Sequence, residues 1–383
     1  MLRFLSSLCA ALISSLRPLT EIEKSISAWP PSAPLGAWLE RLLLAPWLRW
    51  DAVWYERIVT HGYQAQDGTA QFHPLYPWLS AILVRLGIHP LLSLLIVSSI
   101  ATILLGFFFL KLAQMQFTDE EARNSLILFL VFPAAFVLFA PYSEALFLLF
   151  SVLCFYFARR KAWFWAGIAG GLATLTRQQG IFLVLPLAWE MWESSGRKFQ
   201  ATLKIWKQGL NLLLIPAGWL VWIVYRGLAF SDIRPDYHNL NSWLYSVLIS
   251  PSADQVVPSQ TFMWPWKALW IAIQKLARQP DIDLWANLIL GAIFILFLVL
   301  AWRYLRNSER IYVVCLTLVS FSYNTGLTHP YMGLPRHLLL AFPVFLAVGA
   351  FIRKPILRML AIAASLIGSL FMMVLFFLET WVP

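Results

Sequence analysis

Residues 89–111 read HPLLSLLIVSSIATILLGFFFLK, an apolar stretch that decides the class of fold. A helix needs about 20 consecutive apolar residues to cross the hydrocarbon core of a bilayer, and this stretch carries its one charged residue, Lys111, at its end. The whole chain has the same character, because 60% of its 383 residues are hydrophobic and only 13% are charged. Soluble globular proteins have about 25% charged residues. The sequence therefore predicts an integral membrane protein built from helices.

Apolar stretches of this kind recur along the chain and predict ten transmembrane helices. They cover residues 89–111, 124–140, 143–158, 162–176, 181–193, 208–228, 285–302, 310–327, 336–352 and 355–378. Residues 4–19 are interrupted by serines and Arg17, so they are either an eleventh span or an uncleaved signal-like anchor. We therefore expect an all-α, polytopic fold in a single domain over residues 1–383.

Two connections between the predicted spans are large, at about 47–78 and about 229–284. Within the second one, residues 266–278 place tryptophans and aliphatic residues at helical spacing, with basic residues opposite. This pattern predicts an amphipathic helix on the membrane surface, which is either an interfacial anchor or a flap over the headgroup of a lipid substrate. Residues 35–48 have a similar interfacial character.

Lysine and arginine are distributed unequally between alternate connections. When the connection after residue 111 is assigned to the cytoplasm, that side holds fifteen basic residues between Lys111 and Arg358, and the other side holds eight between Arg85 and Arg336. Positive charge favours the cytoplasmic side, so Asp51 lies on the outer face if residues 4–19 span the membrane. The net charge of +10 is thus mainly a topology signal, and no basic domain indicates nucleic-acid binding.

Cysteine and histidine give no sign of a cofactor. Cys9, Cys154 and Cys315 lie in separate apolar stretches, which offers neither a disulfide framework nor a CxxC motif. The spacing of His61 and His73 is not that of metal ligands. We expect no metal and no other cofactor.

A polar and aromatic island, WDAVWYERIVTHGYQAQDGTAQFHPLYP, occupies residues 50–77. Asp51 follows Trp50 and lies one helical turn before Tyr55, on the same face. A carboxylate partly removed from water at the membrane surface is a stronger base, which suits taking a proton from a sugar hydroxyl. An ordinary helix cap is the competing interpretation. The island also supplies candidate substrate contacts in Trp50, Tyr55, His61, Tyr63, His73 and Tyr76.

Later outer connections add a second group of candidates. Arg336 lies in the first turn of its predicted span, where the helix dipole disfavours a cation, so a phosphate bound there would offset the penalty. Glu144, in the motif PYSEALF, begins a predicted span, where stabilisation by the helix dipole is enough to account for a carboxylate. Arg177, in LTRQQG, could likewise serve only to cap helix carbonyls. The candidate substrate-binding residues of this group are Tyr142, Glu144, Arg177, Gln178, His329, Arg336 and His337.

The motifs WDAVWY, HGY, FHPLYP, PYSEALF and LTRQQG follow one another within residues 47–192, and LPRHLL follows within 329–345. In this order they resemble the mannosyltransferase family of the second GPI mannosyltransferase, PIG-V, and its bacterial relatives. That family is similar to the GT-C glycosyltransferases, which are polytopic enzymes. One departure is His73, which stands where the family pattern has a second aromatic residue.

The resemblance implies an inverting transferase that uses a polyprenyl-phosphate sugar, with Asp51 as the catalytic base. We therefore predict that a mannose-like sugar is moved to an acceptor hydroxyl on the outer face of a bacterial plasma membrane. The acceptor is a lipid, glycan or protein, and the expected partners are the lipid-linked donor and membrane lipids. A GT-C transferase for another sugar shares this mechanism. A carrier or flippase for lipid-linked sugars is the other alternative, but it predicts ionisable residues along the spans, whereas here they cluster at one face.

Overall fold

The computed structural model describes residues 8–9, 11–13, 38, 43–64, 68–197, 206–229, 261–324 and 330–377. These residues form helices joined by turns, apart from the two-residue strands β1 (Thr261–Phe262) and β2 (Tyr323–Asn324), which pair antiparallel. The all-α prediction is confirmed for this part of the chain. The predicted span at 4–19 falls mostly outside it.

The first part of the chain runs through short helices into a series of longer ones. Its elements are η1 (Ala45–Trp47), α4 (Asp51–His61), η2 (Thr69–Gln71), α5 (Leu75–Arg85), α6 (Pro90–Ala113), α7 (Asp119–Val131), η3 (Pro133–Phe139), α8 (Glu144–Arg159), α9 (Trp163–Thr176), η4 (Gln178–Leu183), α10 (Val184–Ser194), α12 (Trp206–Gly209), η5 (Leu210–Leu213) and α13 (Leu214–Ala229).

The second part adds a further set of helices. They are α15 (Pro265–Arg278), α16 (Ile282–Ala301), η6 (Trp302–Tyr304), α17 (Asn307–Ser322), α18 (Leu334–Leu339), α19 (Pro343–Phe351) and α20 (Pro355–Phe377). The predicted amphipathic helix at 266–278 is α15, whose tryptophans Trp266 and Trp270 are exposed while Ala268 and Ala272 are buried.

Helix ends follow local sequence signals. Pro90 occupies the first turn of α6, where its missing N–H costs nothing, and the His89 side chain accepts the Leu91 N–H. Thr118 and Glu121 form a capping box at the start of α7. Pro133 then cannot continue that helix, and the chain bends by 82° into η3.

Four helices in the described residues are long and apolar enough to cross a membrane, at Pro90–Ala113, Lys207–Arg226, Ile282–Tyr304 and Pro355–Phe377. The bent pair formed by α7 and η3 makes a fifth if it is one span. The other predicted spans correspond to shorter helices, and the one at 336–352 is broken between α18 and α19. The number of ten spans therefore stays a prediction.

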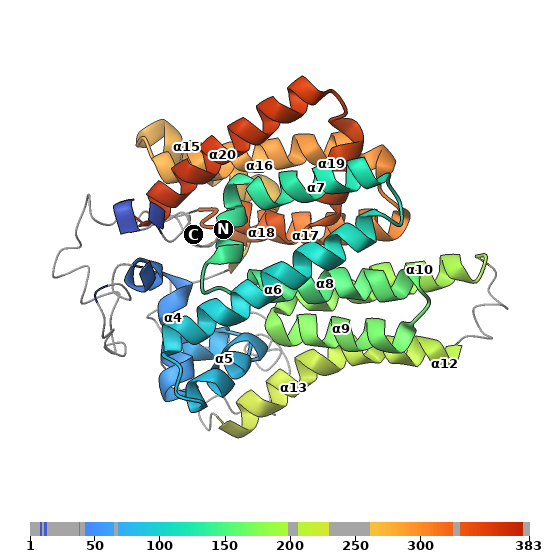
Figure 1. Cartoon of the computed structure of the whole chain (residues 1–383), viewed down its shortest axis with the longest axis horizontal. Helices are drawn as coiled ribbons and strands as arrows, with labels where there is room; N and C mark the ends of the chain where they lie inside the picture. The colour runs from blue at the N-terminus through green and yellow to red at the C-terminus, as the bar shows by residue number, and fades with distance from the viewer. Residues whose placement is uncertain are drawn as a thin grey trace.

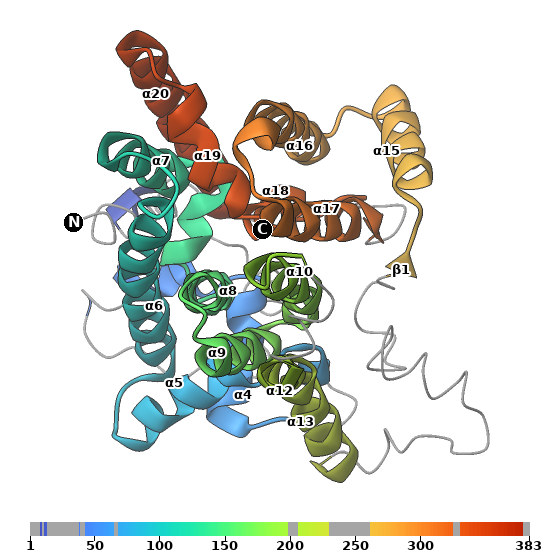
Figure 2. The same cartoon turned by 90° about the vertical axis from the view of Figure 1, so that its right-hand side faces the viewer.

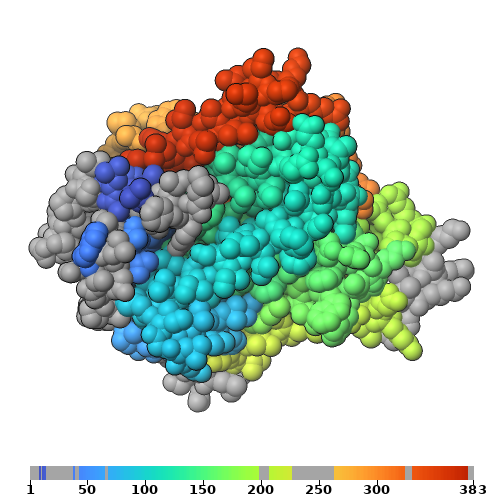
Figure 3. Space-filling view, in the orientation of Figure 1, coloured from blue at the N-terminus to red at the C-terminus, as the bar shows by residue number. Residues whose placement is uncertain are grey.

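The long helices lie side by side, with α4 and α5 at one end of the bundle and α12 at the other (Figure 1). Seen along the helix axes, α8 is surrounded by α6, α9 and α10 (Figure 2), all of which it contacts. The side chains of α6 and α7 form a continuous surface across the middle of the molecule (Figure 3). On that surface Ile100, Ile103 and Phe107 are exposed, as expected for a helix that faces lipid.

Helices α9 and α13 approach each other closely. A methyl group added at Gly171 would lie 2.6 Å from the carbonyl oxygen of Leu214, and one added at Gly218 would meet the carbonyl of Gly171. Small residues let helix backbones approach in this way. The contact holds α13 against the end of α9 from which Arg177 follows.

We expect Gly171→Ala to lower the free energy of unfolding by about 2 kcal/mol, because the added methyl group forces the two backbones apart. The matched control is Gly106→Ala, whose methyl group would meet only a Leu126 side-chain atom at 3.9 Å. Unfolding of both variants in detergent micelles tests the contact, and equal stabilities would contradict it.

Candidate active site

Asp51 is the first residue of α4 and is held there by the C-terminal helix. The preceding Trp50 has a φ of 52°, a strained conformation for a bulky residue and one that often occurs at functional sites. The Trp50 indole donates to the carbonyl of Phe376 at 3.4 Å, and the buried Trp47 packs edge-on against Phe377. These contacts fix the chain entering α4, and the helix dipole favours the negative charge of Asp51.

An ion pair joins Asp51 to the far end of the sequence. Arg336 Nη1 donates to Asp51 Oδ2 at 2.7 Å, although 285 residues separate them. Arg336 comes from α18, and the turn before that helix contains Gly333 and Tyr331, both with positive φ. The Arg336 side chain is 11% exposed and that of Asp51 is 26% exposed. The pair is therefore largely removed from solvent.

Glu144 lies at the centre of the cluster and contacts two arginines. Its Oε1 lies 3.2 Å from Arg336 Nε and accepts a hydrogen bond from Arg177 Nη1 at 2.7 Å. Glu144 is completely buried at the start of α8, where the dipole again favours a carboxylate. Arg177 follows the last residue of α9. Two carboxylates thus face two guanidinium groups.

Neutral side chains close the cluster on the opposite side. Arg177 Nη1 also donates to Ser143 Oγ at 3.1 Å, and the Tyr55 hydroxyl donates to the same oxygen at 2.7 Å. Burial raises the pKa of Tyr55, so its hydroxyl keeps its proton. Because Tyr55 and Asp51 share α4, the contacts form a closed ring made of Asp51, Arg336, Glu144, Arg177, Ser143 and Tyr55. The Arg336 guanidinium also lies over the aromatic side chain of Tyr142, 5.2 Å from its centroid.

The ring leaves buried atoms without a hydrogen bond in the described part of the chain. They are Glu144 Oε2 and Arg177 Nε. Buried polar groups without partners are rare, so this cluster is the candidate active site. No group of three or more metal-binding side chains occurs among the described residues.

A family model described as "Mannosyltransferase (PIG-V)" matches residues 3–230. The chain belongs to this mannosyltransferase family. The match includes Asp51, Glu144 and Arg177 of the ring, whereas Arg336 lies beyond it. The part of the chain outside the family model therefore completes the cluster.

Two crystal structures of ArnT from Cupriavidus metallidurans are similar in fold, one in the apo state and one bound to undecaprenyl phosphate. The first is 13% identical with a TM-score of 0.49, and the match covers 78% of this chain and 53% of that chain. The second is 14% identical with a TM-score of 0.47, with 78% and 52% covered. This chain thus spans about half the length of those proteins. No curated protein matches it.

The other candidates from the polar island differ in their contacts and in their distance from the ring. Tyr76 is completely buried, packs edge-on against Tyr55 and donates to the Leu94 carbonyl at 2.9 Å. Tyr63 donates to the Phe72 carbonyl and contacts Trp222. His61 is exposed at the far end of α4, about 15 Å along the helix from Asp51.

The later candidates also differ in position. His337 is buried against the Tyr323 ring at 5.1 Å, and Gln178 is exposed next to Arg177. His329 lies outside the described residues. Ser143 was not among the sequence candidates, although it is part of PYSEALF and directly precedes Glu144.

Arg336 does not need a phosphate to offset the dipole of a long helix. The helix α18 has only six residues, and Asp51 and Glu144 already supply negative charge beside the guanidinium. A phosphate contact of Arg336 therefore rests on the cluster and not on the helix terminus.

His73 connects the island to α9. Its Nδ1 lies 2.8 Å from the Thr174 carbonyl oxygen, so Nδ1 carries the proton. Burial, with smaller contributions from Arg177 and Arg226, lowers the pKa of His73 to about 3 from its ordinary 6.5. The imidazole is therefore neutral at physiological pH.

We expect Arg336→Met to lower the free energy of unfolding by about 3 kcal/mol, because it leaves buried carboxylates uncompensated. The control is Arg353→Met, which breaks the Arg353–Glu121 pair, where the arginine side chain is 70% exposed and the expected loss is below about 1 kcal/mol. Denaturant titration in micelles compares them. Equal losses would show that the ring carries no special stability.

The shifted pKa of His73 predicts a pH dependence. Between its unfolded value of 6.5 and its folded value of about 3, the unfolded chain binds a proton that the folded chain excludes, so stability falls as the pH is lowered through this range. His73→Gln should reduce the slope of unfolding free energy against pH, measured from pH 6.5 to 5, by up to about one proton. A slope that His73→Gln leaves unaltered would refute the assignment.

Proposed function

We propose that this chain is an inverting glycosyltransferase of the GT-C type. It moves a mannose-like sugar from a polyprenyl-phosphate carrier to an acceptor hydroxyl, on the outer face of a bacterial plasma membrane. The observation that carries the proposal is the ring in which Asp51, Glu144, Arg177 and Arg336 meet at one end of the helical bundle. Membership of the mannosyltransferase family supports it.

Asp51 is the general base. Its side chain is 26% exposed, against 11% for Arg177 and 1% for Glu144, so it is the ring carboxylate that an acceptor hydroxyl reaches from outside. The hydroxyl proton passes to an Asp51 carboxylate oxygen, and general-base catalysis of this kind accelerates a reaction by about 10²–10⁴-fold.

Arg336 and Arg177 bind the donor phosphate. As the acceptor oxygen attacks the anomeric carbon, the bond between that carbon and the phosphate oxygen breaks, and its electron pair leaves with the phosphate. Charge-assisted hydrogen bonds from guanidinium groups are strong and stabilise charge that develops in the transition state. Attack opposite the leaving group inverts the anomeric configuration.

Two tyrosines at the ring are the candidates for contacts with the sugar and the acceptor. Tyr55 belongs to α4 and donates a hydrogen bond to Ser143, and Tyr142 directly precedes Ser143 and lies against the Arg336 guanidinium. The prenyl tail of the donor stays among the apolar helices, so the reaction needs no nucleotide-sugar domain. The excess of basic residues in the connections assigned to the cytoplasm supports an outward-facing ring.

The distribution of charge favours an enzyme over a carrier. Between Glu144 and Arg159 the central helix α8 carries no charged residue, and both of these residues are held in ion pairs. A translocation path for a lipid-linked sugar would place ionisable groups along the spans. The ionic groups of α8 instead lie at its two ends.

The test is transfer of radiolabelled mannose from polyprenyl-phosphate mannose in membranes that contain the chain. We expect Asp51→Asn to lower the rate by at least about 10²-fold, because the amide cannot accept the proton. Asp119→Asn is the matched control, since Asp119 is exposed at the start of α7 and bonds Gln114.

A near-normal rate for Asp51→Asn would remove Asp51 from the role of base. Movement of intact lipid-linked sugar across vesicles, without a mannosylated product, would identify a carrier instead.

A further inference from the structure

We propose that Glu144 is a positioning residue, and that it orients Arg336 so that one guanidinium serves both the base and the departing phosphate. The inference rests on the proposed transfer reaction. It assigns Glu144 no contact with the reacting atoms. Its role is to keep Arg336 in place while the partner of Arg336 changes.

The geometry gives Arg336 two different carboxylates. Its Nη1 faces Asp51 at 2.7 Å, while its Nε faces Glu144 at 3.2 Å. Glu144 is fixed from the other side by Arg177 at 2.7 Å. Because Glu144 is completely buried and Asp51 is not, Glu144 is the rigid partner and Asp51 the accessible one.

The transfer step changes the charge of only one of these carboxylates. When Asp51 accepts the acceptor proton, it becomes neutral and its attraction for Arg336 weakens. In the same step the phosphate gains one negative charge, as the electron pair of the broken bond moves onto it. One unit of negative charge thus passes from one neighbour of Arg336 to another, while Glu144 keeps its own.

A guanidinium can make this exchange because its donors point in several fixed directions. The Nη1 donor turns from Asp51 to the phosphate, and the Nε side stays against Glu144. Because the Nε side is already held by Glu144, only the Nη1 donor changes its partner when charge develops on the phosphate.

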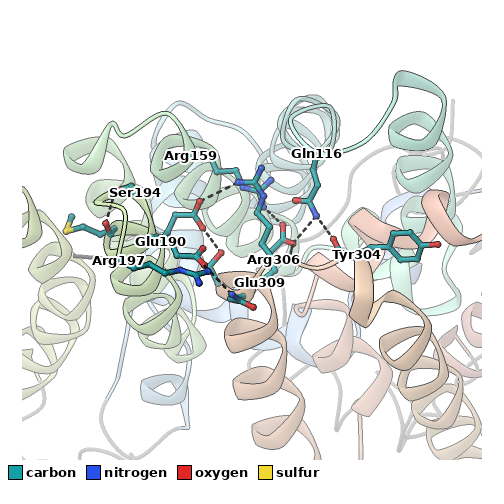
Figure 4. Close-up of polar contacts among 12 residues, drawn as sticks. Gln116, Arg159, Glu190, Ser194, Arg197, Tyr304, Arg306 and Glu309 are labelled. Atoms are coloured by element: carbon teal, nitrogen blue, oxygen red, sulfur yellow. Dashed lines mark hydrogen bonds and ion pairs between the residues drawn. The ribbon is translucent and has the colours of Figure 1, made fainter. Parts of the chain in front are cut away.

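A second buried network at the other end of α8 provides a matched comparison (Figure 4). There Glu309, in the first turn of α17, pairs with Arg159, accepts from Gln116 Nε2 at 3.4 Å and is completely buried. Nearby, Glu190 accepts a hydrogen bond from Ser308 at 2.5 Å and pairs with Arg306 at 3.7 Å. Glu309 thus resembles Glu144 in burial, in its arginine partner and in its place at a helix start, but it lies about 22 Å along α8 from the ring.

The experiment compares Glu144→Gln, Glu144→Asp and Glu309→Gln in the full chain, with kcat, KM for polyprenyl-phosphate mannose and Tm measured for each. We expect Glu144→Gln to lower kcat about 30-fold, more than it raises KM, because transition-state stabilisation is lost. Glu144→Asp keeps the charge and should recover kcat in part. Glu309→Gln should lower Tm similarly and keep kcat within about threefold of wild type.

The inference is overturned if Glu144→Gln and Glu309→Gln lower kcat equally, or if Glu144→Asp recovers nothing. If Glu144→Gln does not fold, Glu144→Asp decides alone: a kcat about tenfold below wild type at a similar Tm supports the inference, and a wild-type kcat overturns it. A wild-type chain that forms no mannosylated product would instead refute the proposed function. The two failures are therefore distinguishable.

Discussion

The contact of the Arg336 guanidinium with the carboxylates of Asp51 and Glu144 is the constraint on which the site depends. Burying a carboxylate without a cation lowers the free energy of unfolding by several kcal/mol. Glu144 can therefore lie at the buried start of α8 only if Arg177 and Arg336 reach it. This requirement brings Arg336 of α18 to the starts of α4 and α8. The interruption between α18 and α19, where an unbroken apolar helix was expected, is followed directly by Pro343, whose ring and missing N–H do not allow a helix to continue through it.

The fold meets this constraint with simple local devices. Asp51 and Glu144 each begin a helix, so both negative charges lie where the helix dipole stabilises them. Arg177 follows the end of α9, and close backbone contact with α13 at Gly171 holds that end in place. The strained φ of Trp50 and the hydrogen bond of its indole to Phe376 direct Asp51 into the ring.

Sequence reasoning found the charged members of the ring but not how they pair. Asp51, Glu144, Arg177 and Arg336 are conspicuous because charges are rare in apolar surroundings. Ser143 was missed, since a serine before a helix is common and its role appears only when Arg177 and Tyr55 converge on it. The phosphate contact of Arg336 stays a prediction, and the two carboxylates that contact Arg336 come from helices distant in the sequence, which local patterns do not reveal.

Apolar runs, helix caps and short motifs act over a few residues, so the chain alone predicts an all-helical membrane protein that resembles the PIG-V mannosyltransferase family, with Asp51 in a polar and aromatic segment. The pairing of Arg336 with an aspartate 285 positions away, and the sharing of Glu144 by two arginines, are seen only in the folded chain. Ion pairs of this kind depend on how helices pack, and apolar periodicity specifies which segments become helices without specifying which of their ends meet.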